Sequence, residues 1–268
     1  MGSIRIGTQG WNYAAWVGAF YPPETRPAEY LGVYARAFDT VEVDATFYGV
    51  PSATTVRSWA SRVSDAFRFA VKMPQEITHE RRLRGSAELT AEFLDRVRAL
   101  GNKLGPVLLQ FGPEFGPTEL PALAAFLPML PRDVQVAAEF RHRGWIHDGV
   151  LALLAEHNVA LVLTDARFVP RRTTLALAER PTADFAYVRW LGPDRDLVDH
   201  SRVQVDRSRD VEIWAEAIRE LAAGTRVVYV FISNFFAGHA PASARMLQER
   251  VGQSPVSPAH LGDQLLLF

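Results

Sequence analysis

Two carboxylates stand one position apart in the stretch 40–48, and this spacing is the first indication of chemistry. Val41 and Val43 alternate with Glu42 and Asp44, which is the period-two pattern of a β-strand. One face of this strand is apolar and the other is acidic. Because a carboxylate buried without a partner is strongly destabilising, we expect the acidic face to meet cations, a metal ion or a water-filled cleft.

Polar side chains also stand at the C-terminal ends of other short apolar segments whose sequences are typical of strands. In the segment 134–141, Glu139 and Arg141 alternate with apolar residues and therefore share one face. The polar residues at such segment ends are Gln9, Lys72, Gln110, Glu139, Arg141, Asp165, Arg189 and Asn234. This mixture of acids, amides and cations is typical of an acid–base or anion-binding site.

Lys72 is one of only two lysines in the chain. Of the 29 basic residues, Lys72 and Lys103 are lysine and the others are arginine. Lys103 lies in a polar turn, where either basic residue would serve, whereas Lys72 ends a predicted strand. An ammonium shifts its pKa readily when it is buried and a guanidinium does not. The sequence therefore favours a role for Lys72 that needs an ammonium in particular.

The elements that must position these side chains alternate regularly along the chain. Strands are predicted near residues 4–11, 40–44, 67–72, 106–111, 134–140, 160–165, 184–190 and 226–232. Helices are predicted near residues 27–37, 54–62, 86–100, 118–127, 148–157, 209–222 and 240–251. The interval 166–183 is rich in arginine and has no clear helical pattern.

Alternation of strands and helices predicts a parallel sheet, and eight such units in this length predict a single (β/α)8 TIM barrel over residues 1–251. Residues 252–268 form a C-terminal linker and apolar tail. A doubly wound open sheet is the competing fold, but no Gly-rich phosphate-binding fingerprint supports it. In a barrel the C-terminal strand ends meet at one mouth, so the polar residues above should converge.

The composition narrows the class of protein. The chain has 268 residues, 48% hydrophobic composition and a formal net charge of −1, which argues against coating nucleic acid through charge. It has no bilayer-length apolar run and no N-terminal signal pattern. The absence of cysteine removes disulfides, thiolate nucleophiles and cysteine-based zinc sites. We therefore expect a cytoplasmic protein.

Five stretches carry distinctive motifs: 7–22 with its Gly-Thr-Gln-Gly-Trp opening, 40–48, 69–79, 104–110 and 139–145. Together they resemble the YecE-like family, a domain of unknown function numbered seventy-two, and the resemblance covers nearly the whole chain. The resemblance implies a TIM barrel with a polar pocket at its C-terminal mouth. It implies no reaction.

The chain departs from the family pattern at two places. The family usually has Arg-x-His-Gly at the seventh strand, where this chain has Arg189-Trp190-Leu191-Gly192, so a role for that histidine cannot be transferred. The usual Asn-Asn after the eighth strand is Ser233-Asn234 here. Both positions lie where barrels commonly hold a phosphate group.

The first functional hypothesis is an enzyme, a hydrolase, isomerase or lyase, acting on a small anionic metabolite such as a sugar phosphate or nucleotide fragment. Arg141 and Arg189 would clamp the anion, while Asp44 and Glu139 share acid–base work. Lys72 would stabilise an oxyanion or form an imine. Glu42 either joins the catalytic carboxylates or anchors Arg5 or Lys72 in a buried pair. Further ligand contacts are assigned to Trp11, Tyr48 and Trp145 as stacking faces, and to Gln9, His79, Gln110, His142, Asp165 and Asn234.

Two alternatives use the same pocket. In a metal-dependent phosphodiesterase or nuclease, Mg²⁺ or Mn²⁺ would bind the hard oxygen ligands Glu42, Asp44, Glu139 and Asp165. The interleaved cations Lys72, Arg141 and Arg189 oppose this, because they compete with a metal for the carboxylates. The other alternative is a ligand-binding protein without catalysis, which needs the same residue types.

The C-terminal end carries a separate feature. Residues 252–260 combine Gly, Ser and Pro, which predicts a flexible linker. The residues of interest beyond it are Gln264, Leu265, Leu267 and Phe268. These apolar residues either fold back over the barrel or act as a binding peptide. The second interpretation rests on a resemblance to the short peptide, with a leading glutamine and a Leu-x-Leu-Phe anchor, by which bacterial proteins bind the replication sliding clamp.

Overall fold

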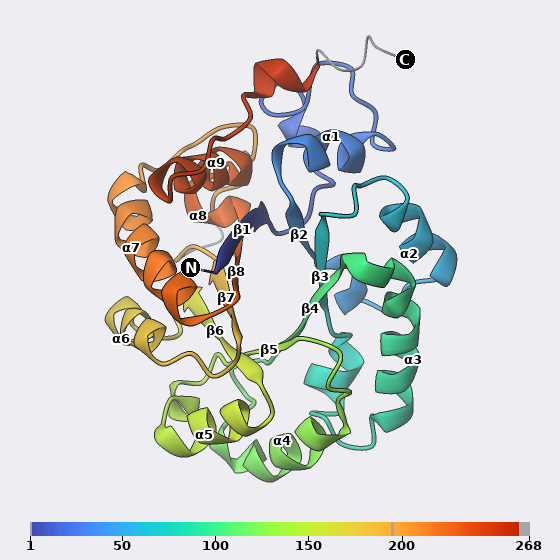
Figure 1. Cartoon of the computed structure of the whole chain (residues 1–268), viewed down its shortest axis with the longest axis vertical. Coiled ribbons are helices and arrows are strands. Elements are labelled where there is room, and N and C mark those ends of the chain that lie inside the picture. The colour runs from blue at the N-terminus through green and yellow to red at the C-terminus, as the bar shows by residue number, and fades with distance from the viewer. Residues whose placement is uncertain (1, 194–195, 263–268) are drawn as a thin grey trace.

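The computed structural model describes residues 2–193 and 196–262 and shows an eight-stranded parallel barrel surrounded by helices (Figure 1). The predicted (β/α)8 fold is confirmed. The strands are β1 (Ser3–Thr8), β2 (Thr40–Val43), β3 (Arg68–Lys72), β4 (Leu104–Gln110), β5 (Val136–Glu139), β6 (Val159–Asp165), β7 (Phe185–Trp190) and β8 (Val227–Ile232). From β2 to β8 each strand pairs in parallel with its sequence neighbour, and β1 pairs in parallel with β8.

The barrel closes between β1 and β2 at their C-terminal ends. Gln9 and Glu42 form a parallel bridge there, and the Gly10 N–H donates to the Glu42 carbonyl at 2.8 Å. Gly7 permits this approach, because a Cβ on it would lie 2.1 Å from the Thr40 carbonyl oxygen. Closure therefore places the first two strand ends, with Gln9 and Asp44, side by side.

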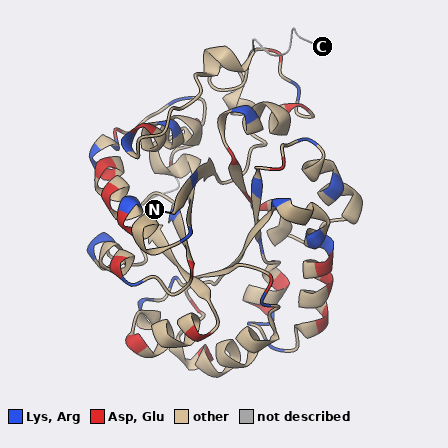
Figure 2. Ribbon diagram, in the orientation of Figure 1, with Lys and Arg blue, Asp and Glu red and all other residues tan. Residues whose placement is uncertain are grey.

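Helices follow most strands and form the outer layer. They are α1 (Tyr30–Ala37), α2 (Ala53–Ala60), α3 (Ala87–Val97), α4 (Leu120–Phe126), α5 (Asp148–Glu156), α6 (Arg171–Ala176), α7 (Ser208–Gly224), α8 (Asn234–Ala237) and α9 (Ala240–Arg250). Ser52 caps α2, accepting a hydrogen bond from the Thr55 N–H at 3.1 Å. Within the described ranges, no helix combines the length and apolarity needed to cross a membrane. Charges of both signs are interspersed over the outer helices (Figure 2).

The core has two parts. The larger part lies between the barrel and its helices and includes Trp214 of α7. The smaller part fills the barrel interior with Ala70, Leu108, Tyr187 and Phe231 among others. Burying a large apolar side chain contributes about 1.5–3 kcal/mol, so both parts stabilise the barrel. The interior cluster closes the lower barrel and leaves the polar strand ends above it.

Residues 252–262 pack on the barrel, although we expected a flexible linker over 252–260. The Gln253 amide donates to the Ile4 carbonyl at 2.8 Å, and Arg36 donates to the Leu261 carbonyl at 2.8 Å. A short helix, Pro258–Leu261, buries Leu261 completely. The Gly/Ser/Pro composition suggested that the entropy lost on ordering this segment would keep it flexible. Burial of Leu261 and the two hydrogen bonds offset that loss of entropy.

The predicted clamp-binding residues Gln264, Leu265, Leu267 and Phe268 lie outside the described residues. If the tail is a binding peptide, as one of the two interpretations has it, a peptide of residues 258–268 should bind a bacterial sliding clamp with micromolar affinity in a fluorescence titration. Phe268→Ala should abolish that binding, because the apolar anchor supplies most of the contact energy in such grooves. Absence of binding by the unsubstituted peptide would leave only a structural role for the tail.

Candidate functional site

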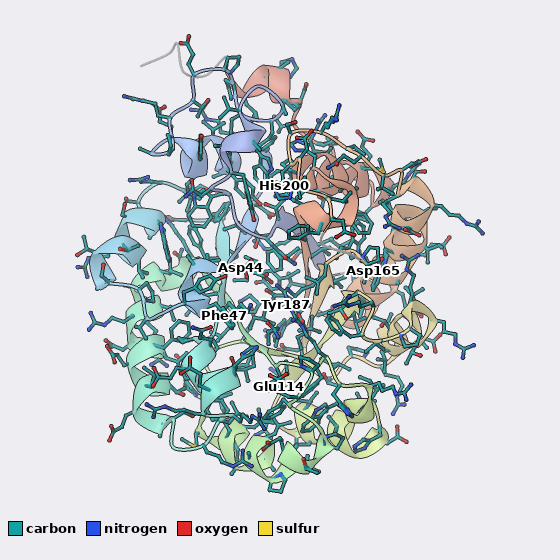
Figure 3. The ribbon with its side chains drawn as sticks, turned by 180° about the vertical axis from the view of Figure 1, so that it is seen from behind. Asp44, Phe47, Glu114, Asp165, Tyr187 and His200 are labelled. Carbon is teal, nitrogen blue, oxygen red and sulfur yellow. The ribbon has the colours of Figure 1, made fainter. Side chains whose placement is uncertain are left out.

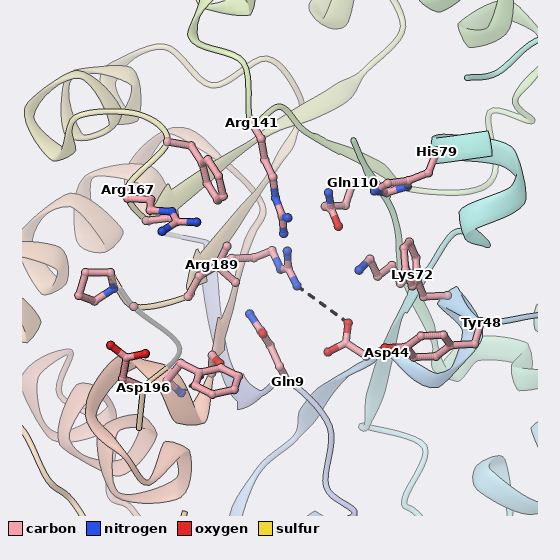
Figure 4. Close-up of a pocket in the computed structure, with 18 of the residues that line it drawn as sticks. Gln9, Asp44, Tyr48, Lys72, His79, Gln110, Arg141, Arg167, Arg189 and Asp196 are labelled. Atoms are coloured by element: carbon pink, nitrogen blue, oxygen red, sulfur yellow. Dashed lines mark hydrogen bonds and ion pairs between the residues drawn. The ribbon is translucent and has the colours of Figure 1, made fainter. Parts of the chain in front are cut away.

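A polar cavity of about 740 Å³ opens at the C-terminal mouth of the barrel (Figure 4). All eight strand ends, or the loops that follow them, contribute to its lining. The lining residues are Gln9, Tyr13, Asp44, Phe47, Tyr48, Lys72, His79, Gln110, Arg141, Ala166, Arg167, Phe168, Arg189, Leu191, Gly192, Pro193, Asp196, Ser233 and Phe235. Eight of the polar and aromatic residues predicted from the sequence are among them.

A buried ion-pair cluster forms the floor of this cavity. Arg189 is only 3% exposed; its Nη2 lies 2.7 Å from Oε1 of Glu42, and its Nη1 pairs with Glu139. The Tyr187 hydroxyl donates to the other Glu42 oxygen at 2.6 Å. Glu42 therefore anchors Arg189, and not Arg5 or Lys72, the two partners considered in one of the alternatives for this residue; Arg5 instead pairs with Asp39 at 2.7 Å.

The surroundings shift the pKa values of the two buried glutamates, Glu42 and Glu139, in opposite directions. Burial raises the pKa of Glu42 above its ordinary value, and the nearby Arg189 only partly offsets that effect. Burial also acts to raise the pKa of Glu139, but Arg189 and Arg141 together hold that pKa below the ordinary value. Both Glu139 oxygens are in ion pairs with these arginines. Glu139 is therefore a poor proton donor near neutral pH, which does not favour the acid–base role predicted for it.

Above the floor, cations are spread around the cavity (Figure 4). Lys72 lies near Asp44, whereas Arg141 and Arg167 lie across the cavity from Asp44, which is 3.9 Å from Arg189. Within the described residues, Oδ1 of Asp44 and Nε2 of Gln9 are buried without a hydrogen-bond partner. Unsatisfied buried polar atoms are destabilising, so these two atoms are suited to bind a ligand or ordered water.

The aromatic lining adds apolar faces next to these charges. The Arg141 guanidinium lies 5.0 Å from the Phe168 ring centroid, and Phe47 contacts the His79 ring edge-on at 5.1 Å. Burial and the nearby Lys72 lower the pKa of His79. Tyr48 is 77% exposed at the rim. A ligand entering the cavity would meet these aromatic faces and several hydrogen-bonding groups.

Five predicted ligand-binding residues lie outside the cavity lining. His142 is exposed and accepts a hydrogen bond from the Gly144 N–H at 3.1 Å, and Trp145 is buried against Phe115. Trp11 lines a second cavity of about 450 Å³, which shares Tyr13 and Asp44 with the first. The other two residues are Asp165 and Asn234.

Asp165 and Asn234 both hold elements together. Asp165 points outward from β6 (Figure 3), where it pairs with Arg171 at 2.9 Å and accepts a hydrogen bond from the Trp214 indole at 2.8 Å. The Asn234 side-chain oxygen accepts hydrogen bonds from the Trp16 indole at 3.1 Å and from the Ala240 N–H at 2.9 Å. These contacts fix α6, α7 and α9 against the barrel.

The four carboxylates considered as metal ligands do not gather. Glu42 and Glu139 are paired with Arg189, while Asp165 faces the helix layer. Over residues 2–193 and 196–262, no three His, Asp or Glu side chains are arranged to hold a metal ion. The donor geometry in this part of the chain gives no support to the metal-dependent alternative.

The lining also contains residues that the sequence pattern did not single out. They are Tyr13, Phe47, Arg167, Phe168, Asp196 and Ser233. Arg167 and Phe168 follow the end of β6 by two and three residues, so their position after a strand was the available signal. Asp196 lies six residues after β7 in a segment without periodicity, where no comparable signal exists.

The fold and this site define a (β/α)8 barrel protein with a polar, charge-lined pocket at the C-terminal mouth. Residues 5–263 match the family described as "Protein of unknown function DUF72". The chain belongs to this family, as its motifs suggested.

Two curated relatives and two solved structures place the chain within this family. It is 29% identical over 265 residues to UPF0759 protein YecE of Escherichia coli K12, covering 92% of each chain. It is 24% identical to UPF0759 protein YunF of Bacillus subtilis 168, covering 92% of this chain and 94% of that one. The crystal structure of a DUF72 family protein from Thermotoga maritima shares the fold with a TM-score of 0.79 at 23% identity, over 94% of this chain and 100% of that one. One from Enterococcus faecalis does so with a TM-score of 0.74 at 21% identity, over 95% and 99%.

Proposed function

We propose that this protein is an enzyme that binds a small anionic metabolite, such as a sugar phosphate or nucleotide fragment, and acts on it by acid–base chemistry. The observation that carries the proposal is Oδ1 of Asp44, which has no hydrogen-bond partner among the described residues and only a 3.9 Å ion pair with Arg189, in a cavity whose other side presents Arg141 and Arg167. A carboxylate oxygen placed in this way can exchange a proton with a ligand that the cations hold.

Arg141 is the main anion-binding residue in this proposal. Its Nε is bound to Glu139 at 3.1 Å, and its two terminal nitrogens have no protein partner in the described part of the chain. Arg189 was expected to share this role, but both of its terminal nitrogens are engaged by Glu42 and Glu139. A bidentate contact with phosphate needs two free N–H groups. We therefore assign the contact with the anion to Arg141, and to Arg189 the role of holding Glu42 and Glu139 in place.

Asp44 supplies the proton-transfer group, and Lys72 supplies a positive charge or a nucleophile. Glu42 and Glu139 contribute through Arg189 and Arg141, whose positions they fix. Gln9 and Gln110 add amide groups that can bind hydroxyl groups of the ligand. The residues that face the cavity therefore contact the ligand, and the buried Glu42 and Glu139 act only by positioning the arginines.

Arg141→Met is expected to weaken phosphate-ligand binding by about 10–100-fold, because a hydrogen-bonded charge contact contributes about 1.5–3 kcal/mol. A panel of sugar phosphates and nucleotides would be screened by thermal shift, and the hits measured by calorimetry. Arg143→Met is the matched control, since Arg143 is exposed and does not line the cavity. The affinity of the Arg143→Met variant for the same ligands should be unchanged.

Turnover of the bound compound, followed by phosphorus and proton NMR, separates an enzyme from a binding protein. Asp44→Asn should retain binding and lose turnover. Equal affinity in the parent protein and the Arg141→Met variant would exclude the proposed anion site. Binding without any conversion would favour the non-catalytic alternative.

A further inference from the structure

The Lys72 side chain lies in an environment unlike that of a structural lysine. It is 9% exposed, lines the cavity, and its Nζ lies 3.7 Å from the centroid of the Phe47 ring. In the described part of the chain, Nζ has no carboxylate within ion-pair distance and no hydrogen-bond acceptor. The amine therefore faces the cavity without a protein hydrogen-bond or ion-pair partner among the described residues.

Local structure fixes this arrangement. The Thr46 hydroxyl donates to the Lys72 carbonyl at 2.7 Å and accepts from the Lys72 N–H at 3.1 Å. These bonds attach the short helix Ala45–Phe47 to the end of β3. Phe47 is thereby held over the lysine side chain and limits the directions in which Nζ can point. A nucleophile needs this kind of restriction to meet a bound substrate in one geometry.

The other lysine provides a comparison within the same chain. The Lys103 ammonium donates to the Ala60 and Val63 carbonyls at 2.8 and 2.9 Å and pairs with Asp65 at 3.3 Å. Three acceptors match the three N–H groups of an ammonium, so the polar interactions of Lys103 are satisfied within the protein. Lys72 has no such set of acceptors.

The surroundings of Lys72 lower its pKa and so increase the fraction of neutral amine. Burial and then the nearby Arg189 lower the pKa of Lys72, against the opposing effects of Asp44, Glu42 and Glu139. The Phe47 ring face favours the ammonium. Each unit by which a lysine pKa falls increases the neutral fraction at pH 7 by about tenfold. A neutral amine is the nucleophilic form.

We infer that Lys72 forms an imine with the carbonyl carbon of a substrate that is an aldehyde or ketone bearing an anionic group. This inference rests on the proposed function, because Arg141 would bind the anionic group. It narrows the substrate class from anionic metabolites to anionic carbonyl compounds.

The step balances without an oxidant or reductant. The lone pair of Nζ forms a bond to the carbonyl carbon, the C=O electron pair moves to oxygen, and that oxygen takes a proton from the Asp44 carboxyl or from water. The amine then loses one proton to Asp44. The hydroxyl takes a further proton and leaves as water while nitrogen forms the C=N bond, giving a protonated imine. This cation would withdraw electrons from the neighbouring carbon and assist proton loss or carbon–carbon cleavage there.

Reductive trapping tests the inference with a defined probe. The full chain would be incubated with glycolaldehyde phosphate and sodium borohydride, and the label located by peptide mass spectrometry, which separates Lys72, Lys103 and the α-amino group. We expect labelling of Lys72 to exceed that of Lys103 at least tenfold and to disappear in Lys72→Met. Lys103→Met should leave the Lys72 label unchanged.

Two comparisons separate this inference from the proposed function. Arg141→Met should reduce labelling by glycolaldehyde phosphate but not by unphosphorylated glycolaldehyde, whereas Arg143→Met should affect neither. If glycolaldehyde phosphate binds in an Arg141-dependent manner and Lys72 is not trapped, the imine is excluded and the anion site stands. Equal labelling of the two lysines would also overturn the inference. Preferential Lys72 labelling that is insensitive to Arg141 would support the nucleophile and exclude the proposed anion site.

Discussion

Replacement of Arg189 by methionine is expected to lower the free energy of unfolding by about 3–5 kcal/mol, because it leaves two buried carboxylates without their cation. Glu42 is fully buried and Glu139 is 1% exposed, so neither can turn to water. Arg141 retains its contact with Glu139 at 3.1 Å, but Glu42 keeps only the Tyr187 hydrogen bond at 2.6 Å. Chemical denaturation at pH 7.5 measures the loss.

The same variant should show an altered dependence of stability on pH. Without Arg189, burial raises the folded-state pKa of Glu42 further above its value in the unfolded chain, and the pKa of Glu139 rises because only Arg141 and Lys72 still oppose the effect of burial. The folded state then binds more protons than the unfolded state in the window between those values. Stability relative to the parent protein should therefore increase as the pH falls from 7.5 towards about 4.5.

Arg167→Met is the matched control, since Arg167 lines the same cavity but is exposed. Its stability should change by no more than about 0.5 kcal/mol. Adding Glu42→Gln and Glu139→Gln to Arg189→Met should recover part of the loss, because no buried carboxylate then remains without the Arg189 cation. A loss below about 1 kcal/mol in Arg189→Met would contradict this account of the cluster.

Most of the barrel could be predicted because its strands and larger helices carry clear periodic patterns. The helix predicted near 86–100 is α3 (Ala87–Val97), and the helix near 209–222 is α7 (Ser208–Gly224). The interval 166–183 contains α6 (Arg171–Ala176), which was not predicted because Arg-Arg-Thr-Thr has no apolar period. The four-residue α8 is likewise too short to show a period.

The position of the pocket could also be predicted, but the pairing within it could not. Alternation placed Glu42 and Glu139 inside the barrel, whereas their common partner Arg189 is 147 residues from Glu42. No local pattern identifies a contact of that separation. Asp165 is a different case, because Ala160 and Val162 belong to the interior cluster and strand alternation therefore points Asp165 outward.

Trp145 shows why proximity in sequence to a predicted site residue is a weak indication of a ligand contact. It was expected to offer a stacking face, but the chain turns after Arg141 into the short helix Arg143–Trp145. The indole then stacks between Phe115 and Phe140, with centroid distances of 5.3 and 4.6 Å. Its N–H donates to the Phe115 carbonyl at 2.6 Å.

Trp145→Ala should therefore lower the free energy of unfolding by about 3–5 kcal/mol, as expected when a large buried side chain is truncated. Trp145→Phe keeps the stacking and leaves the Phe115 carbonyl unpaired, so it should cost about 1–3 kcal/mol. Denaturant titrations of both variants measure these losses. Neither variant removes a group that lines the cavity.

The control is Tyr48→Ala, because Tyr48 lies at the rim of the cavity and is 77% exposed. Its stability should stay within about 0.5 kcal/mol of the parent protein, while its affinity for a phosphate ligand found in the screen should fall. Trp145→Phe should show the opposite combination, with lower stability and unchanged affinity. Reduced affinity in Trp145→Phe at unchanged stability would instead place the indole in contact with the ligand.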